Sequence, residues 1–240
     1  RSTLSSSSAA SDVYKRQVQA RHLAQGRLAG PTFSMPEFWL IPNTLVVPEG
    51  WVSQYPPTHV VAMAVVSRLG IPVLLGPLSF GLTVALLALA LIRLLPDRPK
   101  SARVAALAIA LCPLLVFLGG GSMNHVTTGA CLAAVLYAAL RARDGGPGWS
   151  VAAGLAIGLA VAARPLIGLV LGAVLTLGIW GPTTLRAGAS GFRWLAARVA
   201  GTALGGLPIA ILLGWYNLRL FGDPRTLGYL MAYGDRHRLG

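Results

Sequence analysis

Acidic residues are scarce in this chain of 240 residues. It contains 7 aspartates and glutamates against 20 lysines and arginines, which gives a formal net charge of +13 at pH 7. Charged residues of both signs make up 11% of the sequence, whereas a soluble domain carries about 25%. Hydrophobic residues account for 55%. A surface with this little charge is poorly suited to water. The composition therefore predicts an integral membrane protein.

Cysteine is also rare, and the common signatures of metal and phosphate chemistry are missing. Cys112 and Cys131 both lie inside apolar runs, where we expect small buried hydrophobic side chains. The sequence has no HExxH, no CxxC and no histidine pair at helical spacing, so no metal site is predicted. The three glycines at 119–121 are not followed by lysine and serine or threonine, so they do not form a phosphate loop.

The first residues differ from the rest of the chain. Residues 1–17, RSTLSSSSAASDVYKRQ, are polar, rich in serine and without apolar periodicity. They lack the apolar segment of a signal peptide, and they resemble the adapter-derived tails found at the ends of assembled reading frames. We therefore interpret residues 1–17 as a non-native tail and expect helix only at 18–27. We also expect the chain to be a fragment of a longer protein, cut at both ends.

Residues 18–70 form a segment of mixed character. Four prolines divide its first part, and aromatic residues alternate there with polar ones, as in segments that lie at a membrane interface. The apolar run within 57–69 is too short to cross a bilayer. We interpret it as a helix that lies in the interface or re-enters the membrane. The alternative is that it forms half of a first spanning helix.

Long apolar runs fill the chain from residue 71 to residue 216. The candidate spans are 71–95, 103–119, 125–140, 150–163, 166–181 and 199–216. The sequence therefore predicts an all-α, multi-pass membrane protein whose transmembrane domain, 71–216, holds about six helices. Residues 217–240 would begin a further segment outside the membrane. The lipid bilayer is then the first partner of this chain.

Residues 149–180 are apolar over a length that one straight helix does not explain. Such a helix would measure roughly 48 Å, whereas the hydrocarbon core is about 30 Å thick. Pro165 removes a backbone donor and disfavours helix at Arg164, so two short helices with a turn there are predicted. Glycines spaced four residues apart predict close approach between neighbouring helices. These pairs are Gly154 with Gly158 and Gly201 with Gly205.

Basic residues are concentrated in alternate connections between the spans. The basic connections are 93–103, 141–143 and 186–198, whereas 119–124 has no charge and the 164–165 turn has Arg164 alone. Because cytoplasmic loops are enriched in lysine and arginine, the basic connections are assigned to the cytoplasm. The opposite side then receives 18–70, the 119–125 turn, Arg164 and 217–240. Basic residues that serve topology form no single patch, so no nucleic-acid partner is predicted.

Several polar residues on the non-cytoplasmic side are candidates for a functional site. Glu37 and Glu49 are the acidic residues of the long first segment, and each is either a base or a solvated charge. Arg164 lies near membrane depth, where a cation normally has a partner, so it is predicted to bind an anion. The other candidates are Tyr55, His59, His125, Asn217, Arg219, Asp223 and Arg225. Structural alternatives stay open: a rigid Tyr-Pro-Pro elbow at 55–57, a helix start at His125 and a turn at Asp223.

Five segments in fixed order resemble a known family. They are QARHLAQGRLAGP (19–31), QYPPTH (54–59), SMNHVTTGA (122–130), GLAIGLAVAARP (154–165) and WYNLRLFGDPRTLGY (215–229). The series resembles bacterial membrane glycosyltransferases of the GT-C superfamily, which are related to aminoarabinose transferases and protein O-mannosyltransferases. The resemblance covers most of residues 19–230. It implies a GT-C-like fold in the cytoplasmic membrane.

The resemblance also implies a reaction. A sugar is held on a polyprenyl phosphate in the outer half of the bilayer, and an acidic residue of the first large loop activates the acceptor. Transfer inverts the sugar, and polyprenyl phosphate leaves. Arg164, Arg219 and Arg225 would bind the phosphate, because arginine binds its oxygens bidentately. The substrate-binding residues would be Tyr55, His59, His125, Asn217 and Asp223, and a divalent metal is a possible cofactor.

One departure from the family bears on activity. The relatives carry an Asp-Glu pair a few residues before the Gln-Ala-Arg segment, and here that position falls within 1–17. Asp12 lies at about the right distance but is followed by Val13, so we treat it as coincidence. The fragment is therefore expected to be inactive, with Glu37 and Glu49 as weak candidates for the missing acid. A transporter fragment and a non-catalytic membrane scaffold are the alternatives.

Overall fold

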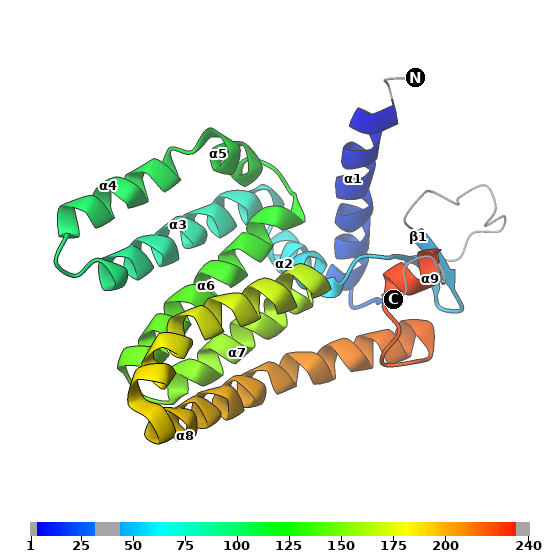
Figure 1. Cartoon of the computed structure of the whole chain (residues 1–240). Helices are drawn as coiled ribbons and strands as arrows, with labels where there is room; N and C mark the ends of the chain where they lie inside the picture. The colour runs from blue at the N-terminus through cyan, green and yellow to red at the C-terminus, as the bar shows by residue number, and fades with distance from the viewer. Residues whose placement is uncertain (1–3, 32–43, 234–240) are drawn as a thin grey trace. The chain divides into compact units, whose positions relative to one another are not determined.

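The computed structural model describes residues 4–31 and 44–233 (Figure 1). In these residues the chain is largely helical, with one two-stranded sheet. It divides into two compact units: unit 1 comprises residues 1–75 with 211–240, and unit 2 comprises residues 76–210. Helix α8 extends from Pro165 to Phe221 and so contributes residues to both units.

Unit 1 is built on two helices that pack against each other, α1 (Leu4–Ala24) and α2 (Pro57–Arg68). Ala20 of α1 and Val60 and Met63 of α2 are buried in one apolar cluster. A proline at the first position of α2 loses no helical hydrogen bond there. The helix predicted within 57–69 is confirmed, as is its short length. The described part of this unit also contains the 3₁₀ helix η2 (Pro72–Leu74), the end of α8 and α9 (Gly228–Tyr233).

α1 is longer than the sequence predicted. The expectation of helix only at 18–27 is wrong, because the helix begins at Leu4 and ends at Ala24. Residues 9–24 are rich in alanine, lysine, arginine and glutamine, which favour helix, so the run continues before residue 18. Lys15 and Arg16 are buried within unit 1. The interpretation of residues 1–17 as a non-native tail stays a prediction.

A small antiparallel hairpin modifies the prediction of a purely α-helical chain. Strand β1 (Thr44–Val47) pairs with β2 (Gly50–Ser53) across the two-residue turn at 48–49. β-branched residues and a tryptophan make both strands suitable for a half-buried sheet. On its other edge, β2 is bonded to Gly30: each of Gly30 and Trp51 donates its N–H to the other's carbonyl, at 2.8 and 3.2 Å. The segment after α1 is thereby fixed to the hairpin.

Unit 2 contains the apolar helices. They are α3 (Leu75–Leu94), α4 (Pro99–Ala110), α5 (Pro113–Gly119), α6 (Asn124–Asp144), α7 (Gly148–Val161) and most of α8. Helices α6 and α7 lie side by side (Figure 1). Prolines start α4, α5 and α8, so the sequence fixes where these helices begin. The turn predicted at Arg164–Pro165 is confirmed, because α7 ends at Val161 and α8 begins at Pro165.

α8 is two helices joined at Gly188. The backbone there has φ 57° and ψ −132°, a conformation that side chains other than glycine rarely adopt. Residue pairs in close contact between α8 and α7 are 168–160 and 172–157 before the break, and 205–151 and 209–158 after it. Before the break, residue numbers rise along α8 as they fall along α7, so the two helices are antiparallel. After the break, the numbers rise along both, so the helices are parallel. The chain therefore turns back at Gly188 and passes α7 twice.

The glycine pairs predicted to allow close approach do so. A Cβ atom added to Gly154 would collide with the backbone of Thr202, and one added to Gly205 would collide with the backbone of Val151. A Cβ atom added to Gly201 would collide with the side chain of Ser150. These contacts lie between α7 and the second part of α8, so the prediction of small-residue packing is confirmed.

The number of spans differs from the prediction. In the described residues three helices are long and apolar enough to cross a membrane: Pro72–Leu94, Asn124–Asp144 and Pro165–Phe221. A fourth exists if α4 and α5, bent by 54°, form one span. The predicted span at 150–163 is too short, because α7 has 14 residues, or about 21 Å. The predicted spans 166–181 and 199–216 both lie in α8. The apolar helices indicate a membrane-embedded protein.

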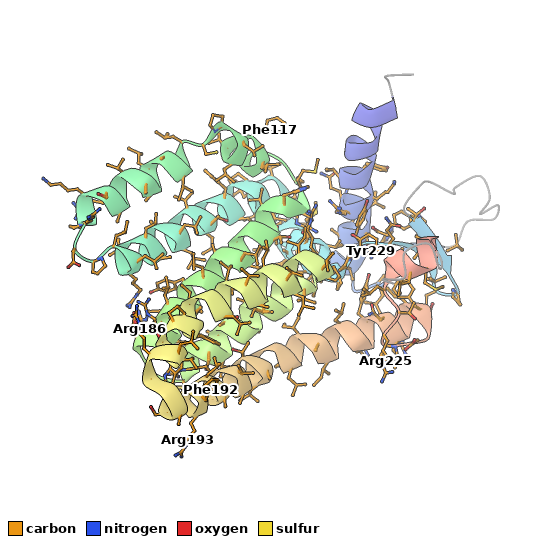
Figure 2. All side chains as sticks on the ribbon, viewed as in Figure 1. Phe117, Arg186, Phe192, Arg193, Arg225 and Tyr229 are labelled. Carbon is orange, nitrogen blue, oxygen red and sulfur yellow. The ribbon has the colours of Figure 1, made fainter. Side chains whose placement is uncertain are left out.

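The three basic connections lie at one end of unit 2. Arg93 of α3 pairs with Asp144 of α6 at 3.8 Å, and Arg198 of α8 donates a hydrogen bond to the carbonyl of Gly145 at 2.8 Å. Trp180 donates to the carbonyl of Ala139 at 2.9 Å. Figure 2 shows Arg186 and Arg193 on the part of α8 around its break. The uncharged 119–124 turn and Arg164 lie at the other end, where Asn124 bonds to Ala163.

Candidate functional site

The five motif segments fall into two groups. Unit 1 contains 19–31, 54–59 and 215–229, and unit 2 contains 122–130 and 154–165. Within each unit, segments far apart in the sequence are in direct contact. Gln19 donates a hydrogen bond to the Tyr216 hydroxyl at 2.9 Å, across 197 positions of sequence. The two groups therefore define two candidate sites, one in each unit.

The main candidate site is a pocket of about 560 Å³ in unit 1. Its wall combines one carboxylate, two guanidinium groups and an indole, with backbone from a glycine-containing segment. The lining residues are Gly26, Arg27, Leu28, Ala29, Gly30, Pro31, Glu49, Trp215 and Arg219. Pockets for small ligands have volumes of about 300–1,000 Å³, so the size suits a small ligand.

Each charged group reaches the pocket from a different element. Glu49 lies in the turn between β1 and β2, and Arg27 lies in the segment that Gly30 fixes to β2. Trp215 and Arg219 are four residues apart near the end of α8, so they share one face of that helix. Glu49 and Arg219 were predicted as site residues. Arg27 and Trp215 were missed, although both lie inside the quoted motifs.

The pocket carries a net positive charge from its side chains, since two arginines face one glutamate. Such a wall attracts phosphate, which arginine binds through paired hydrogen bonds. The positive charge of Arg27 also affects the neighbouring His22. Partial burial, and secondarily the positive charge of Arg27, lower the pKa of His22 below its usual 6.5. The imidazole is therefore kept neutral beside the pocket near pH 7.

A cluster of aromatic rings and one cation holds the 54–59 segment in unit 1. The guanidinium of Arg16 lies 4.0 Å from the centre of the Tyr55 ring. The rings of Tyr55 and Tyr229 meet edge to face, with centres 5.7 Å apart. His59 on α2 is 2% exposed. Figure 2 shows Tyr229 on α9. Tyr55 and His59 are thus packed within unit 1 and do not line the pocket.

The predicted tail residues form a turn after α8. The Asp223 carboxylate accepts hydrogen bonds from the Arg225 N–H at 3.0 Å and from the Thr226 hydroxyl at 3.1 Å. These bonds lower the pKa of Asp223, the bond to Arg225 most. Asn217 donates to the carbonyl of Pro224 at 3.2 Å. The turn described as an alternative for Asp223 is therefore present, and Arg225 does not line the pocket. Glu37 lies outside the described residues.

The second candidate site is in unit 2. Arg164 and His125 are 2.9 Å apart, from guanidinium nitrogen to imidazole Nε2. Since arginine can only donate, Nε2 accepts and the imidazole is neutral in this arrangement. Asn124 holds the two segments together by donating to the Ala163 carbonyl at 2.9 Å, and Thr128 donates to the Asn124 carbonyl at 3.0 Å. The structure brings together two residues that the sequence predicted separately.

Within the described residues, no three histidine, cysteine, aspartate or glutamate side chains are close enough to hold a metal ion. Comparisons of the chain with known protein families, with curated proteins and with solved structures found no match. The chemistry of the two sites is therefore inferred from their own residues.

Proposed function

We propose that this chain is part of a membrane glycosyltransferase that uses a polyprenyl-phosphate sugar donor at the outer face of the cytoplasmic membrane. One observation carries the proposal: Glu49, Arg27 and Arg219 line a single pocket in unit 1. An acid and two cations are the groups that this reaction requires. The order of the five motif segments, with the GT-C resemblance they carry, supports the same proposal.

In the proposed reaction each of these groups has a task. The Glu49 carboxylate accepts the proton of the acceptor hydroxyl while the hydroxyl oxygen attacks the anomeric carbon. The bond between that carbon and the phosphate oxygen breaks with inversion. Arg27 and Arg219 bind the phosphate and stabilise the negative charge that it takes up on leaving. The Trp215 indole offers an apolar face against which a sugar ring can pack.

A binding measurement tests the proposal on the chain itself. The protein is placed in phosphatidylcholine nanodiscs, and binding of polyprenyl phosphate is titrated by the change in tryptophan fluorescence. Each arginine makes a charge-assisted bond worth about 2 kcal/mol. Arg27→Gln and Arg219→Gln are therefore each expected to weaken binding at least about tenfold. Glu49→Gln removes a like charge and should bind as tightly as the parent or more tightly.

Arg68→Gln is the matched control, because it removes the same charge from an exposed position in unit 1 that does not line the pocket. It is expected to leave the affinity unchanged. Equal losses for Arg219→Gln and Arg68→Gln would show non-specific attraction and contradict the proposal. No binding by the parent chain would also contradict it and favour a transporter or a scaffold.

A further inference from the structure

The basic end of unit 2 has a charge and composition that the proposed function does not use. The connections at 93–103, 141–149 and 180–198 together contain nine lysines and arginines and two aspartates. The contacts of Arg93, Trp180 and Arg198 bring the three connections to one end of the helices. A positive surface therefore lies where the apolar helices end.

Arg198 is a buried cation at this end of unit 2. Its side chain is buried, with 8% of the residue exposed. One terminal nitrogen donates to the Gly145 carbonyl at 2.8 Å, and the guanidinium lies 5.1 Å from the centre of the Trp194 ring. Within the described residues, its buried Nε–H has no hydrogen-bond partner and no carboxylate pairs with it. A buried cation in this state is costly unless an anion joins it.

A second arginine adjoins an apolar hollow on the same connection. Arg141 lies 4.3 Å from the centre of the Trp149 ring and donates to the Tyr137 hydroxyl at 3.2 Å. Trp149 also lines a pocket of about 440 Å³. The other lining residues are Gly146, Gly148 and Ala152. The Arg141 guanidinium and the Trp149 indole therefore lie beside a mainly apolar pocket.

We propose that this end of unit 2 binds the headgroup phosphate of an anionic phospholipid. Arg198 and Arg141 would bind the phosphate, and an acyl chain would lie against Trp149 and Ala152. A lipid is the occupant because the site combines cations with an apolar cavity at the end of membrane-type helices. Basic sites between helices at a membrane surface bind anionic headgroups in this way. The residues are separate from the unit 1 pocket, so the two proposals stand or fall independently.

The test uses the whole chain in phosphatidylcholine vesicles that contain either brominated phosphatidylglycerol or brominated phosphatidylcholine. Bromine quenches tryptophan fluorescence on contact, so the ratio of the two curves measures selectivity for the anionic lipid. The parent is expected to prefer phosphatidylglycerol. Arg198→Gln and Arg141→Gln should each reduce the selectivity about fivefold, the usual contribution of one arginine near a lipid surface.

Two further arms make the result decisive. Arg68→Gln, which removes an exposed charge from unit 1, should leave the selectivity unchanged. Because Arg198 is buried, Arg141→Gln keeps the test valid if Arg198→Gln does not fold. Equal quenching by both lipids in the parent would overturn the proposal. So would a loss of selectivity in Arg68→Gln equal to that of Arg141→Gln, or relief of quenching by excess inorganic phosphate.

Discussion

His22 shows how burial changes the properties of one side chain in unit 1. Its ring contacts that of Trp51 edge to face, with centres 6.3 Å apart, and its buried Nδ1 has no hydrogen-bond partner among residues 4–31 and 44–233. Protonation would place a second positive charge near Arg27 in a partly dehydrated position. Burial and Arg27 therefore both lower the pKa of this imidazole, and the folded state prefers the neutral form.

This preference predicts how stability depends on pH. Because the folded pKa is lower than the unfolded value of 6.5, the unfolded chain binds more protons as the pH falls below about 6.5. The contribution of His22 is thus fully present above that pH and is lost as the pH falls through the folded pKa. The thermal midpoint of the protein in detergent, measured from about pH 8 to pH 5, should fall less steeply in His22→Gln. An equal decline in parent and variant would contradict this assignment.

Helix packing gives a prediction at the scale of one element. Gly205→Ala places a methyl group against the Val151 backbone, so the second part of α8 must shift away from α7. Overpacking of this kind costs about 1–3 kcal/mol. Gly178→Ala in the same helix is the control, because open space surrounds that position. Thermal unfolding should show a lower midpoint for Gly205→Ala and an equal or higher one for Gly178→Ala. Equal effects would mean that α7 and α8 are not in close contact.

The sequence predicted some elements and missed others for physical reasons. Apolar length predicted α3 and α6, and Pro165 predicted the start of α8, because these signals are local. The span predicted at 103–119 is divided at Pro113 into α4 and α5, a break that was not predicted. The hairpin at 44–53 was missed, since four-residue strands carry little periodicity. Glu49 and Arg219 were found by charge and side of the membrane, but Arg27 enters the pocket only because Gly30 pairs with Trp51. A single sequence carries no local signal for contacts between segments that are far apart along the chain.

The alternation of basic and uncharged connections predicts the membrane topology of the whole chain. Native Cys112 and Cys131 are first replaced by serine or alanine, and single cysteines are then introduced at four positions. Those at Lys100 and Ser190 should be shielded from an impermeant thiol reagent in intact cells, because basic connections stay in the cytoplasm. Those at Ser122 and Thr226 should react. The reverse labelling pattern would place the Arg164 turn and residues 217–240 in the cytoplasm and contradict the proposed outer-face reaction.

The hydrogen bond between Gln19 and Tyr216 has a consequence for biosynthesis. Unit 1 is made from both ends of the sequence, and 197 positions separate these two residues. At a synthesis rate of about 5–20 residues per second, the first part must wait roughly 10–40 s for its counterpart. During that interval Gln19 of α1 and the apolar cluster of Ala29, Val47 and Val52 lack the last turns of α8. Nascent unit 1 therefore keeps this apolar surface uncovered until Tyr216 has been synthesised, and exposed apolar surface of this kind makes a folding chain prone to aggregation.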